Sequence, residues 1–287
     1  MTSARGRFLA NRGAVVGAVL VALLLALVVF APLLERRDPI ALDIDHGLTS
    51  LGAPLAPSAD APLGTDHLGR DVWSRVVAGA GTSLEIATAA TAIALVLGLL
   101  VGLVAGYAGG RTDDFLMRLV DLGLSFPFLL LAILLAALLH ESQLGSSIAP
   151  VYITLGVVGW TTIARVVRGK TLTLARSEMV TAARALGAST ARIITHYLLP
   201  NLASLVVAIT ALGFAQNLLA ESVLSYLGLG PQPPTPSWGR MLYEGRVYYR
   251  SAPWLVLAPG VAIMLAVVGF NLVGDGLRDA LDPRERR

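Results

Sequence analysis

Apolar residues occur in this chain as long, nearly uninterrupted runs, separated by segments that contain charged residues, Gly and Pro. The runs are about 20 residues long, which is the length that an α-helix needs to cross the hydrocarbon core of a bilayer. We therefore predict an all-α polytopic membrane protein with six transmembrane helices, near residues 14–34, 86–107, 122–139, 148–164, 202–219 and 254–273. An even number of spans places both termini on the same side of the membrane.

The first apolar run follows Arg5, Arg7 and Arg12, an arrangement that a secretory signal peptide shares. This run, however, extends over about 21 residues and ends in FAPLLERR, which contains no small-x-small cleavage site. We therefore interpret residues 1–13 as a short N-terminal segment and residues 14–34 as a retained transmembrane helix.

The positions of Lys and Arg predict the orientation, since the cytoplasmic segments of membrane proteins carry an excess of these residues. With both termini cytoplasmic, 15 of the 22 basic residues lie on the cytoplasmic side, including six in residues 165–200 and four in residues 276–287. Residues 35–82 then form a long extracytoplasmic loop, and its four prolines predict an irregular structure. Residues 83–275 contain the other five spans.

The composition agrees with a membrane protein and narrows the possible chemistry. Apolar residues make up 55% of the chain and charged residues only 14%, against about 25% charged residues in soluble domains. There are no cysteines, which excludes disulfides and thiolate chemistry, and the four histidines do not occur at metal-ligand spacing. We therefore predict no metal site, no catalytic residue and no nucleic-acid binding.

Two patterns that carry catalytic or nucleotide-binding chemistry in other proteins are incomplete here. The tripeptide GKT at residues 169–171 resembles the end of a phosphate-binding loop, but Ala164 occupies the position where that loop requires glycine. An enzyme embedded in the membrane would need paired polar residues inside the bilayer, and Asn217 and Asn271 are too sparse to supply them. We therefore predict that this chain is not itself an enzyme.

Small residues predict where the spans pack against one another. Gly98, Gly102 and Gly106 recur every four residues in the second span, which places them on one helix face and allows another helix to approach closely. Pro127 lies inside the third predicted span, where we expect it to kink the helix.

An ion-gradient-driven secondary transporter is the alternative function that the spans allow. Such a protein is expected to contain inverted repeats and ionisable residues near the middle of the bilayer, and the sequence indicates neither. Glu85 and Glu221 lie at the predicted outer ends of two spans. Each is either a functional carboxylate or a solvated one, and the sequence leaves both interpretations open.

The basic segment 165–200 contains a single acidic residue, Glu178, and its six bases exclude it from the bilayer core. Its apolar residues predict one face of a short helix: Met179, Val180, Ala182, Ala183 and Leu186. Gly187 then ends this helix, Ser189 caps a second one, and Pro200 is expected to end the second helix. This element is either an amphipathic pair that lies on anionic lipid or a docking element for a cytoplasmic partner.

The same segment resembles a known family. In permease subunits of bacterial ABC importers the cytoplasmic loop reads Glu-Ala-Ala, three residues, Gly, nine residues, Ile-x-Leu-Pro. Here Thr181-Ala182-Ala183, Gly187 and Tyr197-Leu198-Leu199-Pro200 have this spacing, with Thr181 in place of Glu and Tyr197 in place of Ile. Four longer segments are similar to the C-type permease of the dipeptide/oligopeptide/nickel group: residues 62–84, 106–127, 221–246 and 270–284.

The resemblance implies the type I importer permease fold, with cytoplasmic coupling helices, in the bacterial cytoplasmic membrane. It implies four kinds of partner: a second permease subunit, two cytoplasmic ATPase subunits that bind ATP and Mg, an extracytoplasmic solute-binding protein, and the lipid bilayer. It also implies that peptides or related small solutes are transported, although no residue of the sequence identifies a substrate-binding site. The residues expected to couple to the ATPases are Glu178, Thr181, Ala182, Ala183, Arg184, Gly187, Leu199 and Pro200.

Overall fold

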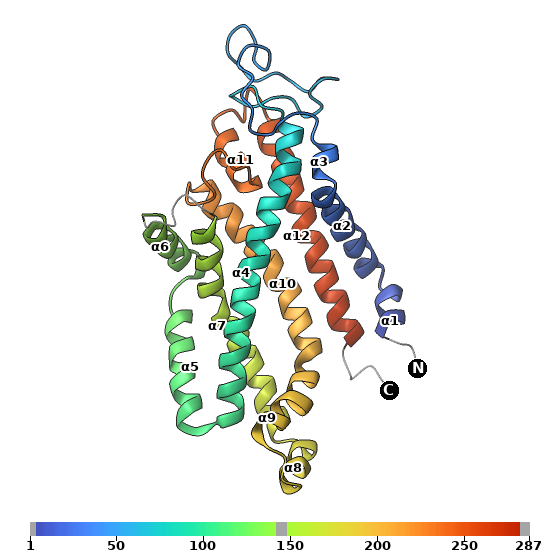
Figure 1. The fold of residues 1–287 in the computed structure, drawn as a ribbon, viewed down its shortest axis with the longest axis vertical. Helices are drawn as coiled ribbons and strands as arrows, with labels where there is room; N and C mark the ends of the chain where they lie inside the picture. Colours follow the sequence, from blue (N-terminus) through green and yellow to red (C-terminus); the bar gives the residue numbers. More distant parts are fainter. Residues whose placement is uncertain (1–3, 142–147, 282–287) are drawn as a thin grey trace.

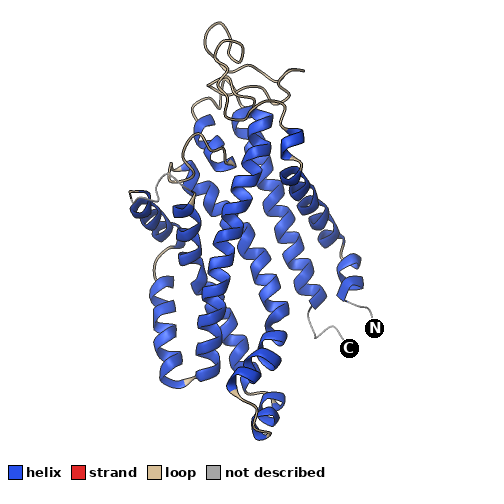
Figure 2. Cartoon of the chain, viewed as in Figure 1, coloured by secondary structure: helices blue, strands red, loops and turns tan. Residues whose placement is uncertain are grey.

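The computed structural model describes residues 4–141 and 148–281, and these form an elongated bundle of helices (Figure 1; Figure 2). The helices are α1 (Ala4–Ala10), α2 (Arg12–Val29), α3 (Ala31–Leu34), α4 (Val72–Ala108), α5 (Gly110–Leu124), α6 (Phe128–His140), α7 (Ala149–Ala175), α8 (Glu178–Ala185), α9 (Thr190–Ile193), the π-helix η1 (Ile194–Leu198), α10 (Leu199–Tyr226), α11 (Trp238–Gly245) and α12 (Trp254–Leu281). Within these described residues, five continuous helical segments are long and apolar enough to cross a membrane, and the bent pair α5–α6 makes a sixth candidate. The predicted all-α class is confirmed.

The third predicted span is not the kinked helix that the sequence suggested. Helix α5 ends at Leu124, and α6 begins at Phe128 after Pro127 and runs at 86° to α5. Pro127 therefore stands before the first turn of a new helix, where its missing N–H leaves no bond unmade.

Helix α4 begins earlier than the sequence predicted. Residues 35–82 were expected to be loop, but the carboxylate of Asp71 accepts a hydrogen bond of 2.9 Å from the backbone N–H of Ser74 and caps a helix that starts at Val72. The 37 residues of α4 extend over roughly 55 Å, which exceeds the thickness of a bilayer core. Residues 35–71 contain no helix, as their prolines predicted.

Helices α4 and α7 lie in close contact along the glycine stripe. A Cβ atom at Gly98 would lie 2.6 Å from Cβ of Ile163, and one at Gly102 would lie 2.6 Å from the carbonyl oxygen of Ala164. Real side chains do not tolerate such distances, so only glycine permits this packing. The predicted packing role of the stripe is confirmed.

Helix α7 continues to Ala175, so residues 165–175 of the predicted basic loop are helical. Arg168 donates two hydrogen bonds to the carboxylate of Asp113 on α5, at 2.5 and 2.6 Å, and Arg165 pairs with Asp121 of the same helix. Two bases of the predicted loop therefore lie on α7 and form charge-assisted contacts with acids of α5.

Residues 35–71 and α11 are joined at one end of the bundle by a buried cluster of charges. The carboxylate of Asp66 accepts a hydrogen bond of 2.6 Å from Arg70, and Glu244 accepts bonds of 2.8 and 2.9 Å from Arg70 and Arg75. Burial alone would raise the pKa of Glu244, but the positive charges of Arg75, Arg70 and Arg240 outweigh that effect and hold its pKa below the ordinary value. This charge cluster ties the loop to the start of α4.

Candidate functional site

The basic segment forms a projection at the opposite end of the bundle from residues 35–71 (Figure 1). The projection consists of α8, α9 and η1, and α8 extends beyond the ends of the neighbouring helices (Figure 1). The Ser177 side chain caps α8 by accepting a hydrogen bond from the N–H of Val180, and the Ser189 side chain caps α9 by accepting one from Arg192. Two short helices joined at a glycine were predicted from the sequence, and the predicted cap at Ser189 is confirmed.

Gly187 lies at the turn between the two helices with a φ of +80°, a conformation that L-residues rarely adopt. The N–H of Gly187 donates to the carbonyl of Arg184 at 2.9 Å, and the N–H of Ala188 donates to that of Ala183 at 3.0 Å. An added Cβ would meet no atom within 4 Å. The glycine is therefore required by the backbone conformation and not by space.

The predicted apolar face of α8 is in fact divided between two sides. Val180 and Ala183 are buried, with Val180 in a cluster that includes Ile193 and Leu198. Met179, Ala182 and Leu186 point away from this cluster, and Leu186 is 88% exposed. The prediction of one continuous face was wrong because α8 is only eight residues long and packs on the bundle along a narrow strip.

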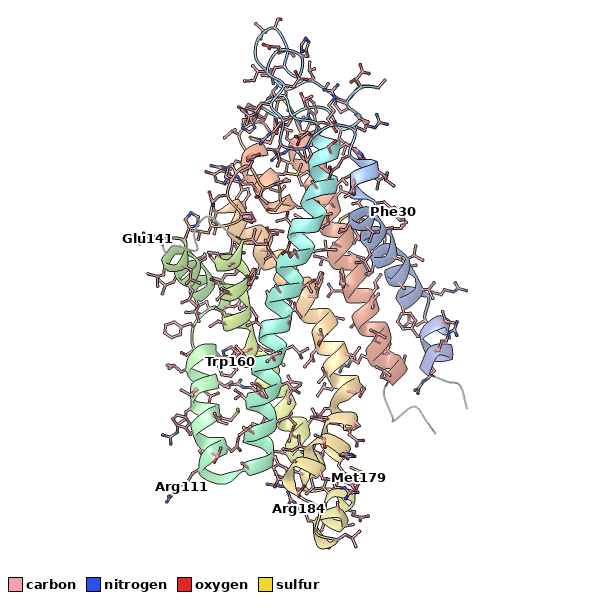
Figure 3. The ribbon with its side chains drawn as sticks, in the orientation of Figure 1. Phe30, Arg111, Glu141, Trp160, Met179 and Arg184 are labelled. Carbon is pink, nitrogen blue, oxygen red and sulfur yellow. The ribbon has the colours of Figure 1, made fainter. Side chains whose placement is uncertain are left out.

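The other coupling candidates on α8 lie on its accessible surface. Glu178, in the first turn, and Thr181 are exposed. Arg184 is exposed as well, but its guanidinium lies 5.1 Å from the ring centroid of Tyr107, at the end of α4. Figure 3 labels Arg184 and Met179 at this end of the chain. No local pattern predicts the contact with Tyr107, because it joins residues of two separate helices.

Pro200 does not end a helix, which contradicts the prediction. Residues 190–226 form one continuous helical run, in which the π-helix η1 immediately precedes Leu199 and Pro200. Pro200 lacks the N–H that would bond to the carbonyl of His196 in an α-helix, and a widened π-turn accommodates the proline without breaking the run. The side-chain amide of Asn201 also donates to the carbonyl of Tyr197 at 2.7 Å.

A cavity of about 570 Å³ lies between α4, α6, α7 and α10. Most of its lining is apolar, and its polar residues are Thr91, Thr162, Gln216 and Asn217. The side-chain N–H of Asn217 donates to the Thr91 hydroxyl at 2.9 Å, and that hydroxyl donates to the carbonyl of Ala87 at 2.7 Å. In the sequence Asn217 stands apart from other polar residues of the spans, because its hydrogen-bond partner Thr91 is 126 residues away.

Glu85 and Glu221, whose roles the sequence does not decide, differ in their surroundings. Glu221 is completely buried in α10 and accepts a hydrogen bond of 2.7 Å from the Ser225 hydroxyl, so it is not solvated. Glu85 is exposed and lines a second cavity between α2 and α4. Neither lies in the projection or in the cavity that contains Asn217.

Asp66, His67 and Glu244 bring potential metal-ligating atoms within 4.8 Å of one another. Both carboxylates already accept hydrogen bonds from guanidinium groups, namely those of Arg70 and Arg75. A cation would have to displace these positive charges, so the arrangement fits a structural ion-pair cluster rather than a metal site.

Comparisons with known proteins agree with the resemblance noted in the sequence. Residues 98–287 match the family model described as the binding-protein-dependent transport system inner membrane component, and residues 1–54 match the N-terminal TM domain of oligopeptide transport permease C. The chain is 40% identical to the dipeptide transport system permease protein DppC of Alkalihalophilus pseudofirmus over 274 residues, covering 96% of this chain and 86% of the relative. It is 37% identical to the oligopeptide transport system permease protein OppC of Bacillus subtilis over 281 residues, covering 98% and 88%.

Among solved structures, the chain is similar to the inward-facing conformations of the MetNI methionine ABC transporter, with a TM-score of 0.61 and 20% sequence identity. The match covers 72% of this chain and 97% of the other. At this identity the similarity establishes the fold alone.

Proposed function

This chain belongs to the family of binding-protein-dependent transport system inner membrane components, and we propose that it forms half of the translocation pathway of an ATP-driven importer of peptides. The observation that carries the proposal is the similarity, along nearly the whole chain, to dipeptide and oligopeptide transport permeases. An ion-gradient-driven secondary transporter is not favoured, because the family is one of binding-protein-dependent transport and the relatives are permease proteins of peptide transport systems.

In the proposed assembly a companion permease completes the pathway, and two cytoplasmic ATPase subunits bind ATP and Mg in place of this chain. The projection and both termini face the cytoplasm in this assembly, because Lys and Arg are concentrated in residues 165–200 and near the two ends of the chain. Residues 35–71 and α11 then face a solute-binding protein on the other side of the membrane, at the end of the bundle opposite to α8 (Figure 1).

Helix α8 is the proposed contact with an ATPase subunit. Met179, Ala182 and Leu186 recur at positions i, i+3 and i+7 and form an exposed apolar stripe on a segment that faces water in this orientation. Glu178, Thr181 and Arg184 flank the stripe and are exposed to the same partner.

Ala183 has a different role from Ala182, because Ala183 is buried. Val180, on the same buried side of α8, packs in a cluster with Ile193 and Leu198 and so attaches α8 to the helical run that contains Leu199 and Pro200. A displacement of α8 by the ATPases would therefore be passed into α10 and tip the bundle between two states of the pathway.

The proposal is tested by purifying this chain with its companion permease, ATPase subunits and binding protein, and by measuring uptake of labelled di- and tetrapeptides into liposomes. We expect uptake that requires both ATP and the binding protein. Uptake by the isolated chain driven by a proton gradient would instead establish a secondary transporter. Purification of the chain from native membranes without any ATPase, even after crosslinking, would also refute the proposal.

A further inference from the structure

The cavity between α4, α6, α7 and α10 contains polar side chains within stretches that the sequence predicts to cross the bilayer. Gln216 and Thr162 are exposed there, although both belong to apolar helices and line the same cavity. An amide that faced lipid tails would lose its hydrogen bonds without replacement. The exposed amide of Gln216 therefore indicates that this face of α10 meets a polar ligand or water.

Beside these exposed groups, the buried pair of Asn217 and Thr91 is fixed in place. Asn217 is 5% exposed, and its hydrogen bond to Thr91 orients the amide. Its carbonyl oxygen lies beside Gly159, since a Cβ atom added there would be 4.0 Å from it. Gly159 and Gly213 line the cavity without side chains and leave room for a ligand next to the pair.

The lining of the cavity is electrically neutral. Of the residues that line it within 4–141 and 148–281, none is charged. Arg165 follows Thr162 by one helical turn, and Asp121 pairs with it. The polar contacts that the lining offers to a ligand therefore come from amide and hydroxyl groups, and the charged pair lies towards the α8 end of α7.

We propose that Gln216, together with Asn217, Thr91 and Thr162, forms a half-site of the pathway that binds the peptide bonds of the transported substrate through neutral amide and hydroxyl groups. This inference rests on the proposed function and assigns the contacts that the pathway makes with its substrate. Amide side chains both donate and accept hydrogen bonds, as a peptide bond does. Every peptide carries these groups regardless of its side chains, so such a site recognises peptides of varied sequence.

The experiment compares trialanine with a depsipeptide analogue, in which an ester replaces one of its two amides and removes one N–H donor. Uptake of both by the complete complex in liposomes is measured at a saturating concentration of binding protein, for the wild type and for Gln216→Leu. Leu219→Met is the matched control, because Leu219 lines the same cavity without a polar group. We expect Gln216→Leu to reduce kcat/KM for trialanine about fivefold, as the loss of one hydrogen bond would.

The ester analogue makes the result specific to recognition of the amide. Gln216→Leu should change transport of the depsipeptide much less than transport of trialanine, whereas Leu219→Met should leave both unchanged. A similar loss for both substrates, or no loss for either, would overturn the assignment even though the complex transports peptides. If the wild type shows no ATP-dependent uptake of trialanine, the proposed function fails and the assignment fails with it.

Discussion

Gly187 offers the sharpest test of how the projection couples to the rest of the chain. Its φ of +80° is unfavourable for any residue with a Cβ, by about 1–2 kcal/mol, and more for a β-branched residue. The position is otherwise open, because an added Cβ meets no atom within 4 Å. Replacement of Gly187 by Val therefore perturbs the angle between α8 and α9 without creating a clash.

A graded series of variants separates backbone strain from other effects. Asn tolerates the left-handed conformation better than Ala, and Ala better than Val, so the order Gly, Asn, Ala, Val should follow increasing strain. A strain of about 1.4 kcal/mol changes the population of the native turn tenfold relative to alternatives. We expect the thermal midpoint of the complex to change little along the series, because Gly187 and Leu186 are exposed and lie outside the buried core.

The assay is binding-protein-stimulated ATP hydrolysis measured together with peptide uptake, so that the number of ATP molecules hydrolysed per peptide can be compared. We expect Gly187→Asn to resemble the wild type and Gly187→Val to lose most of both the stimulation and the uptake. Gly169→Ala is the control, since Gly169 is helical, exposed and equally open. Normal coupling in Gly187→Val would refute the argument that this turn sets the position of α8.

Three further results are expected. Gly102→Leu should lower the thermal midpoint and the yield of the complex, because overpacking of this kind costs roughly 1–3 kcal/mol. Gly81→Ala is the control and should change neither, because a Cβ atom at Gly81 meets no atom within 4 Å. Equal midpoints for the two variants would contradict the close packing of α4 on α7. Since the pKa of Glu244 is lowered in the folded state, its contribution to stability is fully present above its unfolded pKa of about 4.3 and is lost as the pH falls through the folded value. Thermal midpoints measured from pH 7 downwards should therefore fall in acid. Glu244→Gln should remove that part of the pH dependence, and it leaves Arg75 paired with Asp66 but without the Glu244 carboxylate at every pH. Leu186→Asp should reduce co-purification of the ATPase subunits. The thermal midpoint of the chain itself should not change, because the Leu186 side chain is 88% exposed. Undiminished co-purification would exclude the exposed apolar stripe of α8 as the contact.

The sequence predicts those parts of the fold that depend on local patterns. Hydropathy located the spans, the glycine stripe predicted the contact between α4 and α7, and Gly187 with Ser189 predicted the two short helices. Each of these signals depends on residues within a few turns of one another.

Features that depend on distant partners were not predictable. The cap of α4 at Asp71 is local, but Arg75 in its first turn is buried and pairs with Glu244, which lies 169 residues further along the chain. The separation of Met179 and Leu186 from Val180 depends on which side of α8 packs against the bundle. Pro200 remains inside a helix because the preceding turn widens, and the sequence carries no local signal for such a turn.

The uninterrupted run from Thr190 to Tyr226 has a mechanical consequence. At 1.5 Å per residue its 37 residues form a lever arm roughly 55 Å long, so a tilt of about 5° at the α9 end would swing the far end by about 5 Å. Near that far end, the buried Glu221 holds the Ser225 hydroxyl, and Trp238 of α11 donates to the carbonyl of Val76 in α4 at 2.9 Å. If α8 and α9 are displaced as proposed, a small rotation at that end would become a displacement of several ångströms at the other end of the run.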